Sequence, residues 1–238
     1  MKVIILAGGL GTRISEETAD KPKPMVLIAG KPMLWHIMSI FAEQGFSDFI
    51  VATGYKGEVI SHWVESIDTT WNITIVDTGL KTQTGGRIKQ CMNLLPGERI
   101  LATYGDGVGN IDINQLLAFH FSHGKMASLT AVRPPARFGY LDIKGGKVLR
   151  FGEKNQGDAG WINGGFFVLE PKVLEYISSD SEPFEAGALP KLALEGQLMA
   201  YQHDGFWQPM DTMREKQELE KSLSDVPPLK HLPRWNLR

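Results

Sequence analysis

Short apolar segments alternate with amphipathic ones along the first half of the chain. Residues 32–44 place Leu34, Ile37 and Phe41 at helical spacing, and Gly45 follows directly. Further helices are expected over 58–67 and 112–121, where Asp112 and Gln115 have the spacing of a capping box. Apolar runs with the length of strands lie at 3–7, 49–52, 73–76, 100–104 and 128–132. This alternation predicts a parallel α/β sheet.

The pattern changes near Arg133, where glycines and prolines that favour turns become frequent. Three short β segments are expected at 140–143, 148–151 and 166–169. We expect them to cover the open edge of the sheet and to form a lid over a ligand. A single domain is therefore predicted over residues 1–223, with two halves that meet near residue 110. Residues 224–238 contain too many prolines for a regular helix and should wrap the surface or a neighbouring subunit.

Composition excludes some classes of partner. The 238 residues carry a net charge of −2, so no overall field favours nucleic acid or an anionic membrane. No apolar stretch approaches the roughly 20 residues of a membrane span. Cys91 is the only cysteine, which rules out an internal disulfide and suits the reducing cytoplasm. We expect a cytoplasmic enzyme or binding protein that binds phosphates through a local pocket.

A glycine-rich segment follows the first apolar run directly, from Leu6 to Arg13. In an open parallel sheet the loop after the first strand lies at the ligand-binding edge. Its glycines allow backbone N–H groups to approach phosphate, and the guanidinium of Arg13 adds a charged fork. A dinucleotide fingerprint would need a small residue where Ile14 stands, and a P-loop would need a Gly-Lys-Ser/Thr sequence that is absent. The alternative is a plain tight turn between a strand and a helix.

Two lysines separated by prolines follow in the sequence Lys21-Pro-Lys-Pro-Met25. The prolines exclude an α-helix, so we expect an extended loop. Lys21 is interpreted as a solvated side chain. Lys23 is assigned to the triphosphate because its loop follows directly from the phosphate-binding turn.

Motifs spread over nearly the whole chain resemble those of the sugar-phosphate nucleotidyltransferases, above all their glucose-1-phosphate cytidylyltransferase branch. They are LAGGLGTR (6–13), KPKPM (21–25), GYKG (54–57), VDTG (76–79), TGGR (84–87), YGDGV (104–108), RFG (137–139), INGGFFVLEP (162–171) and GFWQPMDT (205–212). The resemblance implies a Rossmann-like mixed, mainly parallel sheet, with a nucleotide-binding half and a smaller β-rich half that binds the sugar.

The resemblance also assigns the site. Residues assigned to nucleotide binding are Leu6, Ala7, Gly8, Gly9, Gly11, Thr12, Arg13, Lys23, Gln83, Gly85, Gly86 and Asp106, of which Arg13, Lys23 and Asp106 are catalytic. Residues assigned to the sugar phosphate are Gly139, Glu153, Lys154, Asn163, Gly164 and Trp207, although Trp207 suits a buried core position equally well. Asp106 and Asp211 are expected to hold Mg²⁺, because hard cations prefer carboxylate and phosphate oxygens.

Two histidines, the single cysteine and one short segment have other interpretations. His120 and His123 lie three residues apart on a helix end, a spacing seen in metal sites, but without a nearby Cys or carboxylate partner they are interpreted as a solvent-facing pair. Cys91 lies among apolar residues and is interpreted as core. The segment 68–72 is shorter than the corresponding segment of the resembled enzymes, which carries extra residues. If those residues form subunit contacts in the resembled enzymes, the oligomer is expected to differ here.

These observations predict a nucleotidyltransferase that condenses CTP with a sugar 1-phosphate, glucose 1-phosphate by resemblance, and releases pyrophosphate. No nucleic-acid or membrane partner is expected, whereas assembly into a homo-oligomer is expected. Thymidylyl or uridylyl transfer on the same scaffold is the alternative within the class. A non-catalytic sensor of nucleotide sugars is the alternative outside it, but such a protein should have lost Arg13, Lys23 or one of the two aspartates.

Overall fold

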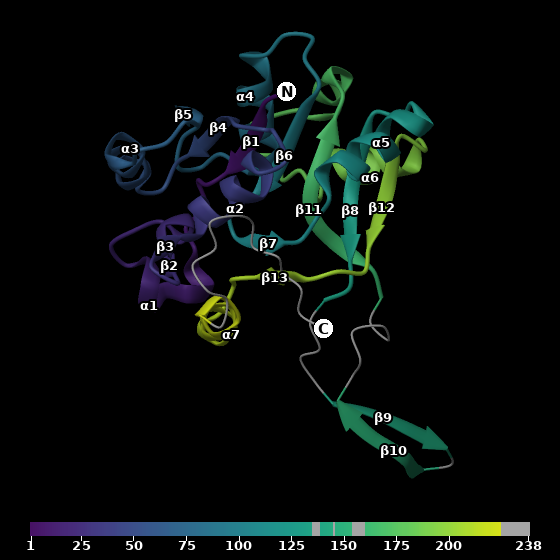
Figure 1. The fold of residues 1–238 in the computed structure, drawn as a ribbon. Helices are drawn as coiled ribbons and strands as arrows, with labels where there is room; N and C mark the ends of the chain where they lie inside the picture. The colour runs from purple at the N-terminus through teal and green to yellow at the C-terminus, as the bar shows by residue number, and fades with distance from the viewer. Residues whose placement is uncertain (135–138, 145, 154–159, 225–238) are drawn as a thin grey trace.

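The computed structural model describes residues 1–134, 139–144, 146–153 and 160–224 (Figure 1). Seven strands form the central sheet in the order β12-β8-β11-β6-β1-β4-β5. These strands are β1 (Val3–Leu6), β4 (Asp48–Thr53), β5 (Asn72–Asp77), β6 (Ile100–Tyr104), β8 (Ala127–Val132), β11 (Ile162–Leu169) and β12 (Leu198–His203). Six of them run in one direction, while β11 is antiparallel to both of its neighbours. The mixed, mainly parallel α/β sheet is confirmed.

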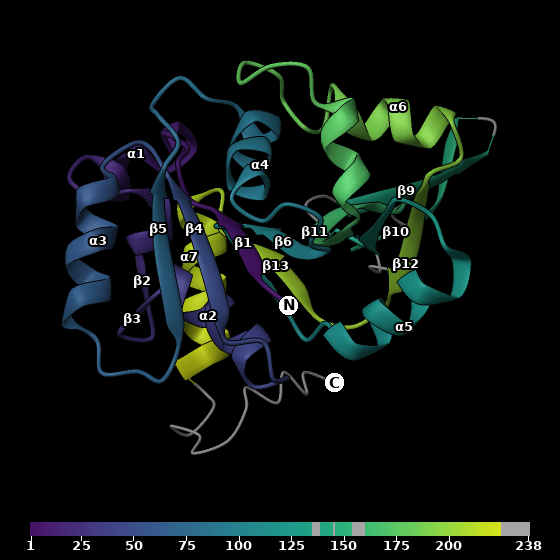
Figure 2. The same ribbon diagram turned by 90° about the horizontal axis from the view of Figure 1, so that it is seen from above.

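Helices cover both faces of the sheet (Figure 2). They are α1 (Ser15–Thr18), α2 (Met33–Ala42), α3 (Gly57–Ser66), α4 (Thr84–Asn93), α5 (Ile113–His123), α6 (Ala188–Leu194) and α7 (Met213–Ser224). Side chains of β1 alternate between two buried clusters, as the period of a strand requires. Val3 and Ile5 pack in the cluster that includes α2, whereas Ile4 and Leu6 pack in the cluster that includes α4. A strand buried on both faces explains the unbroken apolar run at the N-terminus.

The capping prediction for α5 is confirmed in its main contact. The side chain of Asp112 accepts a hydrogen bond from the backbone N–H of Gln115 at 2.9 Å. The Gln115 side chain bonds to the Asp112 carboxylate at 3.0 Å, whereas a full capping box would use the Asp112 backbone N–H. This contact still fixes the start of the helix.

The second half differs from the expectation for its turn-rich segment. Strands β9 (Gly139–Lys144) and β10 (Lys147–Glu153) pair only with each other, in a hairpin that projects from the body of the molecule (Figure 1). They therefore do not extend either edge of the central sheet, which β12 and β5 form. Residues 166–169 instead belong to β11 inside the sheet. Of the tail predicted over residues 224–238, Ser224 is the last residue of α7, and residues 225–238 lie outside the described residues.

Two small two-stranded sheets complete the fold. Strand β2 (Leu27–Ile28) pairs with β3 (Lys31–Pro32), and β7 (Gly107–Gly109) pairs with β13 (Trp207–Pro209). Pro209 lies opposite Gly107, and the N–H of Met210 donates to the carbonyl of Asp106 at 2.8 Å. This pairing joins segments that are far apart in the sequence, and it brings their two aspartates together. No helix of the described residues is long and apolar enough to cross a membrane.

Candidate active site

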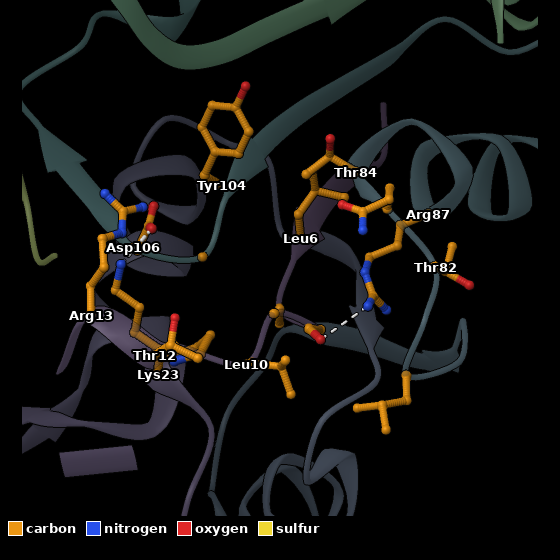
Figure 3. A pocket seen from close by; sticks show the side chains of 18 residues that line it. Leu6, Leu10, Thr12, Arg13, Lys23, Thr82, Thr84, Arg87, Tyr104 and Asp106 are labelled. Carbon is orange, nitrogen blue, oxygen red and sulfur yellow. Dashed lines mark hydrogen bonds and ion pairs between the residues drawn. The ribbon is translucent and has the colours of Figure 1, made fainter. Parts of the chain in front are cut away.

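A cavity of about 370 Å³ opens at the carboxyl ends of β1 and β6 and at the start of α4 (Figure 3). The residues that line it are Leu6, Ala7, Gly8, Gly9, Leu10, Gly11, Thr12, Arg13, Lys23, Pro24, Leu80, Thr82, Gln83, Thr84, Arg87, Tyr104, Gly105 and Asp106. Ten of the twelve residues assigned to the nucleotide from the sequence are among them, Gly85 and Gly86 being the exceptions. The structure thus gathers the glycine-rich loop, a lysine and a carboxylate around one space.

The glycine-rich loop needs its glycines for two different reasons. Gly11 has φ = 65°, a left-handed conformation that favours glycine, and it leads into a 3₁₀ turn at Thr12–Ile14. A Cβ on Gly8 would lie 2.1 Å from the Arg87 guanidinium, so no larger residue fits without displacing that side chain. These positions bring the loop backbone to the wall of the cavity.

The loop after the glycine-rich segment differs slightly from its expected extended form. Residues Lys23–Met25 make one 3₁₀ turn, which begins after an extended Pro22. Proline is compatible with the first positions of such a turn, where its missing N–H is not needed. The Lys23 side chain is buried as a result and points to the charged end of the cavity, where Figure 3 shows it beside Asp106.

Lys23 lies between the two aspartates predicted to hold a metal. Its Nζ is 2.7 Å from Oδ2 of Asp106 and 2.5 Å from Oδ1 of Asp211. Arg13 Nη1 reaches the other oxygen of Asp211 at 2.7 Å. The two carboxylates therefore converge on the lysine ammonium, which partly neutralises their negative charges.

Asp211 is held by a capping box that the sequence analysis did not recognise. The Glu215 carboxylate accepts hydrogen bonds from the backbone N–H groups of Asp211 and Thr212, at 2.7 and 2.9 Å. The Thr212 hydroxyl accepts in turn from the N–H of Glu215 at 3.3 Å. The signal was present, because Thr212 and Glu215 have the Thr-x-x-Glu spacing that begins a helix.

The donor set fits a magnesium ion that is also bound by substrate phosphates. Among the residues that the structure describes, no three His, Cys, Asp or Glu side chains group as a metal site. The protein therefore offers two carboxylates, from Asp106 and Asp211, and phosphate and water oxygens would supply the other ligands. Mg²⁺ is commonly bound in this way, through one or two carboxylates and the phosphates of its substrate.

Gly85 and Gly86, which were assigned to nucleotide binding, are not among the lining residues, although their chain neighbours Thr84 and Arg87 are. Gly85 and Gly86 are buried in the first turn of α4, a helix that the sequence analysis did not predict. A Cβ on Gly85 would lie 2.5 Å from the carbonyl oxygen of Glu182, and one on Gly86 would lie 2.4 Å from that of Asp180. Their role in the structure is close backbone packing, whereas Gln83 does line the cavity.

The residues assigned to the sugar lie in several places. Asn163 donates to the Tyr104 hydroxyl at 3.0 Å, and Tyr104 lines the cavity. Trp207 is buried, and its indole N–H donates to the Gly164 carbonyl at 2.9 Å, so it supports β11 from the core. Gly139 and Glu153 lie opposite each other where the hairpin of β9 and β10 begins and ends. Lys154 lies outside the described residues.

A network around Tyr104 joins the two halves of the chain. Its hydroxyl donates to the Glu185 carboxylate at 2.6 Å, and the Thr84 hydroxyl donates to the other oxygen of Glu185 at 2.6 Å. Burial, together with the charge of Glu185, raises the pKa of Tyr104 well above its ordinary value, so the phenol stays protonated. Glu185 could not be predicted from the sequence, because it belongs to none of the motifs.

The interpretation of His120 and His123 as a solvent-facing pair is wrong for His120. This side chain is buried, with Nδ1 2.9 Å from the Ser128 hydroxyl and Nε2 3.0 Å from the Glu170 carboxylate. Burial lowers the pKa of His120. The missing partner was Glu170, which is distant in sequence. Cys91 is buried, as expected, and burial raises its pKa to about 12.

The fold and the cavity together define a class of protein. A glycine-rich loop, two cationic side chains and two convergent carboxylates lie together at the carboxyl edge of an α/β sheet, where backbone N–H groups and cations can bind phosphate oxygens. This is the arrangement of a nucleotide-dependent enzyme.

Comparisons with known proteins give the family. The Nucleotidyl transferase family matches residues 2–215. The chain is 50% identical to glucose-1-phosphate cytidylyltransferase of Salmonella typhimurium, over 92% of this chain and 95% of that protein. It is 42% identical to the probable glucose-1-phosphate cytidylyltransferase of Bacillus subtilis, over 93% and 95%. The crystal structure of HddC from Yersinia pseudotuberculosis matches with a TM-score of 0.75 and 26% identity, over 93% of this chain and 99% of that one. The chain belongs to the nucleotidyl transferase family.

Proposed function

We propose that this enzyme condenses CTP with glucose 1-phosphate to give CDP-glucose and pyrophosphate. The choice of substrates is supported by the 50% identity to glucose-1-phosphate cytidylyltransferase over nearly the full length of both chains. The proposed chemistry is supported by the contacts of Lys23 with Asp106 and Asp211 at one end of the cavity. Arg13, Lys23 and both aspartates are all present, so the features that a non-catalytic sensor should have lost are retained.

The reaction on this site requires alignment and charge stabilisation. The sugar 1-phosphate is largely dianionic at neutral pH, since the second pKa of a phosphate monoester is near 6, so it needs no general base. Arg13, whose side chain is exposed at the mouth of the cavity, is proposed to neutralise the departing pyrophosphate. Lys23 is proposed to bind the α-phosphate, and Lys154 the incoming phosphate.

Mg²⁺ is part of the proposal, with Asp106 and Asp211 as its protein ligands. When bound, it would polarise the phosphoryl oxygens as a Lewis acid. Lys23 would then exchange its contacts with the two carboxylates for contacts with the triphosphate.

Gln83 is the side chain proposed to contact the base. The Gly8 carbonyl already accepts from the Tyr55 N–H at 3.2 Å and from Arg87 at 3.0 Å, so both of its lone pairs are used. Gln83 is exposed at the cavity and offers an amide oxygen to the amino group of cytosine and an amide N–H to N3. The same amide, rotated, suits uracil, so the choice of CTP rests on the relatives.

The test compares kcat/KM for CTP, UTP and dTTP at fixed glucose 1-phosphate, followed by pyrophosphate release. A preference for CTP is expected, and it can reach about 10⁴-fold where a buried polar group would be left unpaired. UTP or dTTP matching CTP would refute the cytidylyl assignment and leave the family assignment standing. A cytoplasmic location and a homo-oligomeric state stay predictions, and light scattering of the purified protein tests the second.

A further inference from the structure

Arg87 is a buried charge in the wall of the cavity, and the proposed reaction does not use it directly. It is 4% exposed and projects from α4. Its Nη1 donates to the Thr53 carbonyl at 2.7 Å and to the Thr78 hydroxyl at 2.5 Å, and its Nη2 donates to the Gly8 carbonyl at 3.0 Å. Its three acceptors belong to segments that follow or end three neighbouring strands, β1, β4 and β5.

The backbone is shaped around this guanidinium. A Cβ on Gly8 would lie 2.1 Å from Arg87 Nη1, and a Cβ on Gly54 would lie 2.6 Å from the same atom. Gly54 begins the GYKG motif, so glycines of two separate motifs make room for one side chain. Burial lowers the pKa of Arg87 and the charge of Asp77 opposes this, but an arginine remains protonated at neutral pH. Burial of such a cation lowers the free energy of unfolding, so it is expected only where its position serves the structure or the site.

The contact with Gly8 also determines the orientation of the next N–H group. In a trans peptide the C=O and the N–H point in opposite directions. The Gly8 carbonyl points at Arg87, so the N–H of Gly9 points away from it. Gly9 is exposed and lines the cavity, and among the described residues this N–H has no hydrogen-bond partner. A peptide between two glycines has few steric restraints against reversal, so it needs anchors to keep one orientation: the charged Arg87 donor at 3.0 Å is the stronger one, and the Tyr55 N–H at 3.2 Å is the other.

We infer that Arg87 is a positioning residue of the nucleotide site. It holds the Gly8–Gly9 peptide so that the Gly9 N–H is free to donate to an oxygen of the bound nucleotide. It does this without touching the reacting atoms. Lysine cannot replace it, because one ammonium on a flexible stem does not reach three acceptors with the fixed geometry of a guanidinium. The inference rests on the proposed function, since it requires that a nucleotide binds in this cavity.

The test is steady-state kinetics of Arg87→Lys, with Arg99→Lys as the matched control. Arg99 pairs with Glu170 at 2.5 Å and does not line the cavity. Loss of a hydrogen bond from a charged group predicts a KM for the nucleotide about 10- to 100-fold higher. kcat and the KM for the sugar phosphate should change much less, and the Arg99 variant should keep the wild-type KM for nucleotide.

The possible outcomes separate the two proposals. A folded Arg87→Lys protein with a lower Tm and an unchanged nucleotide KM would show a merely structural role and overturn the inference. If lysine prevents folding, Thr78→Val removes one acceptor and leaves the arginine, and its nucleotide KM should rise about threefold. An unchanged KM there would also overturn the inference. Wild-type enzyme that uses no nucleoside triphosphate with any sugar 1-phosphate would refute the proposed function instead.

Discussion

Replacement of Lys23 by methionine should destabilise the protein, because the carboxylates of Asp106 and Asp211 would repel each other without the lysine charge between them. The Lys23 side chain is 10% exposed, and its two partners Asp106 and Asp211 are 33% and 16% exposed. Breaking a fully buried ion pair costs about 3–5 kcal/mol because the remaining charge is left without a partner. The partial exposure of Asp106 and the contact of Arg13 with Asp211 reduce this, so we expect a loss of about 2–3 kcal/mol. For a chain of this length that corresponds to a Tm about 5–10 °C lower.

Differential scanning calorimetry with and without Mg²⁺ is the assay. The added cation should raise the Tm of Lys23→Met more than that of wild type, because it takes over the neutralisation of the two carboxylates. Lys21→Met is the matched control in the same loop, and it should change stability by less than about 0.5 kcal/mol. An unchanged Tm in Lys23→Met, with no larger response to Mg²⁺, would refute the description of this lysine as the counter-ion of both aspartates.

The remaining predictions concern catalysis, the core and pH. Asp106→Asn and Asp211→Asn should each lower kcat about 100-fold or more with an unchanged circular dichroism spectrum, and near-normal rates at saturating Mg²⁺ would remove the metal site from the mechanism. Lys154→Ala should mainly raise the KM for the sugar phosphate, whereas Lys23→Ala should mainly slow nucleotidyl transfer; interchanged effects would reverse the two assignments. Trp207→Phe loses the hydrogen bond to the Gly164 carbonyl and should lower the free energy of unfolding by about 1–2 kcal/mol in urea titrations, and an unchanged value would mean that this bond adds nothing. Burial lowers the pKa of His36 from its ordinary value of 6.5. The unfolded state therefore binds a proton at this histidine at a higher pH than the folded state does. As a result, the free energy of unfolding falls as the pH drops below about 6.5. His36→Gln should flatten that dependence in urea titrations between pH 5 and 7, and an undiminished slope would contradict it.

Periodicity predicted most of the sheet. The apolar runs that became β1, β4, β5, β6 and β8 are short and lie next to helical patterns, which is enough to indicate an α/β sheet. The direction of β11 could not be read, since an apolar strand has the same appearance whichever way it runs. Helix α4 was missed because Gly85 and Gly86 have low helix propensity. Tertiary contacts compensate: the N–H of Gly85 bonds to the Glu182 carbonyl at 3.1 Å, and Phe184 bonds to the Thr84 hydroxyl at 2.8 Å.

The site was predicted where motifs mark it and missed where distant segments meet. The glycine-rich loop, Lys23 and Asp106 line one cavity because the loop follows β1 and the aspartate follows the neighbouring β6. That Asp211 joins them was expected only from the family resemblance, because β7 and β13, which bring it there, are three-residue strands without a periodic signal. The buried position of Arg87 could not be predicted from the sequence, since its acceptors lie on three other segments.

Transfer of a nucleotidyl group onto a sugar phosphate can be followed by ³¹P NMR of a single reaction mixture. The mixture contains the wild-type protein, CTP, glucose 1-phosphate and Mg²⁺. We expect CTP and glucose 1-phosphate to disappear together while pyrophosphate and a nucleoside diphosphate sugar appear in equal amounts. Unchanged substrates, or loss of CTP at the same rate without the sugar phosphate, would contradict it.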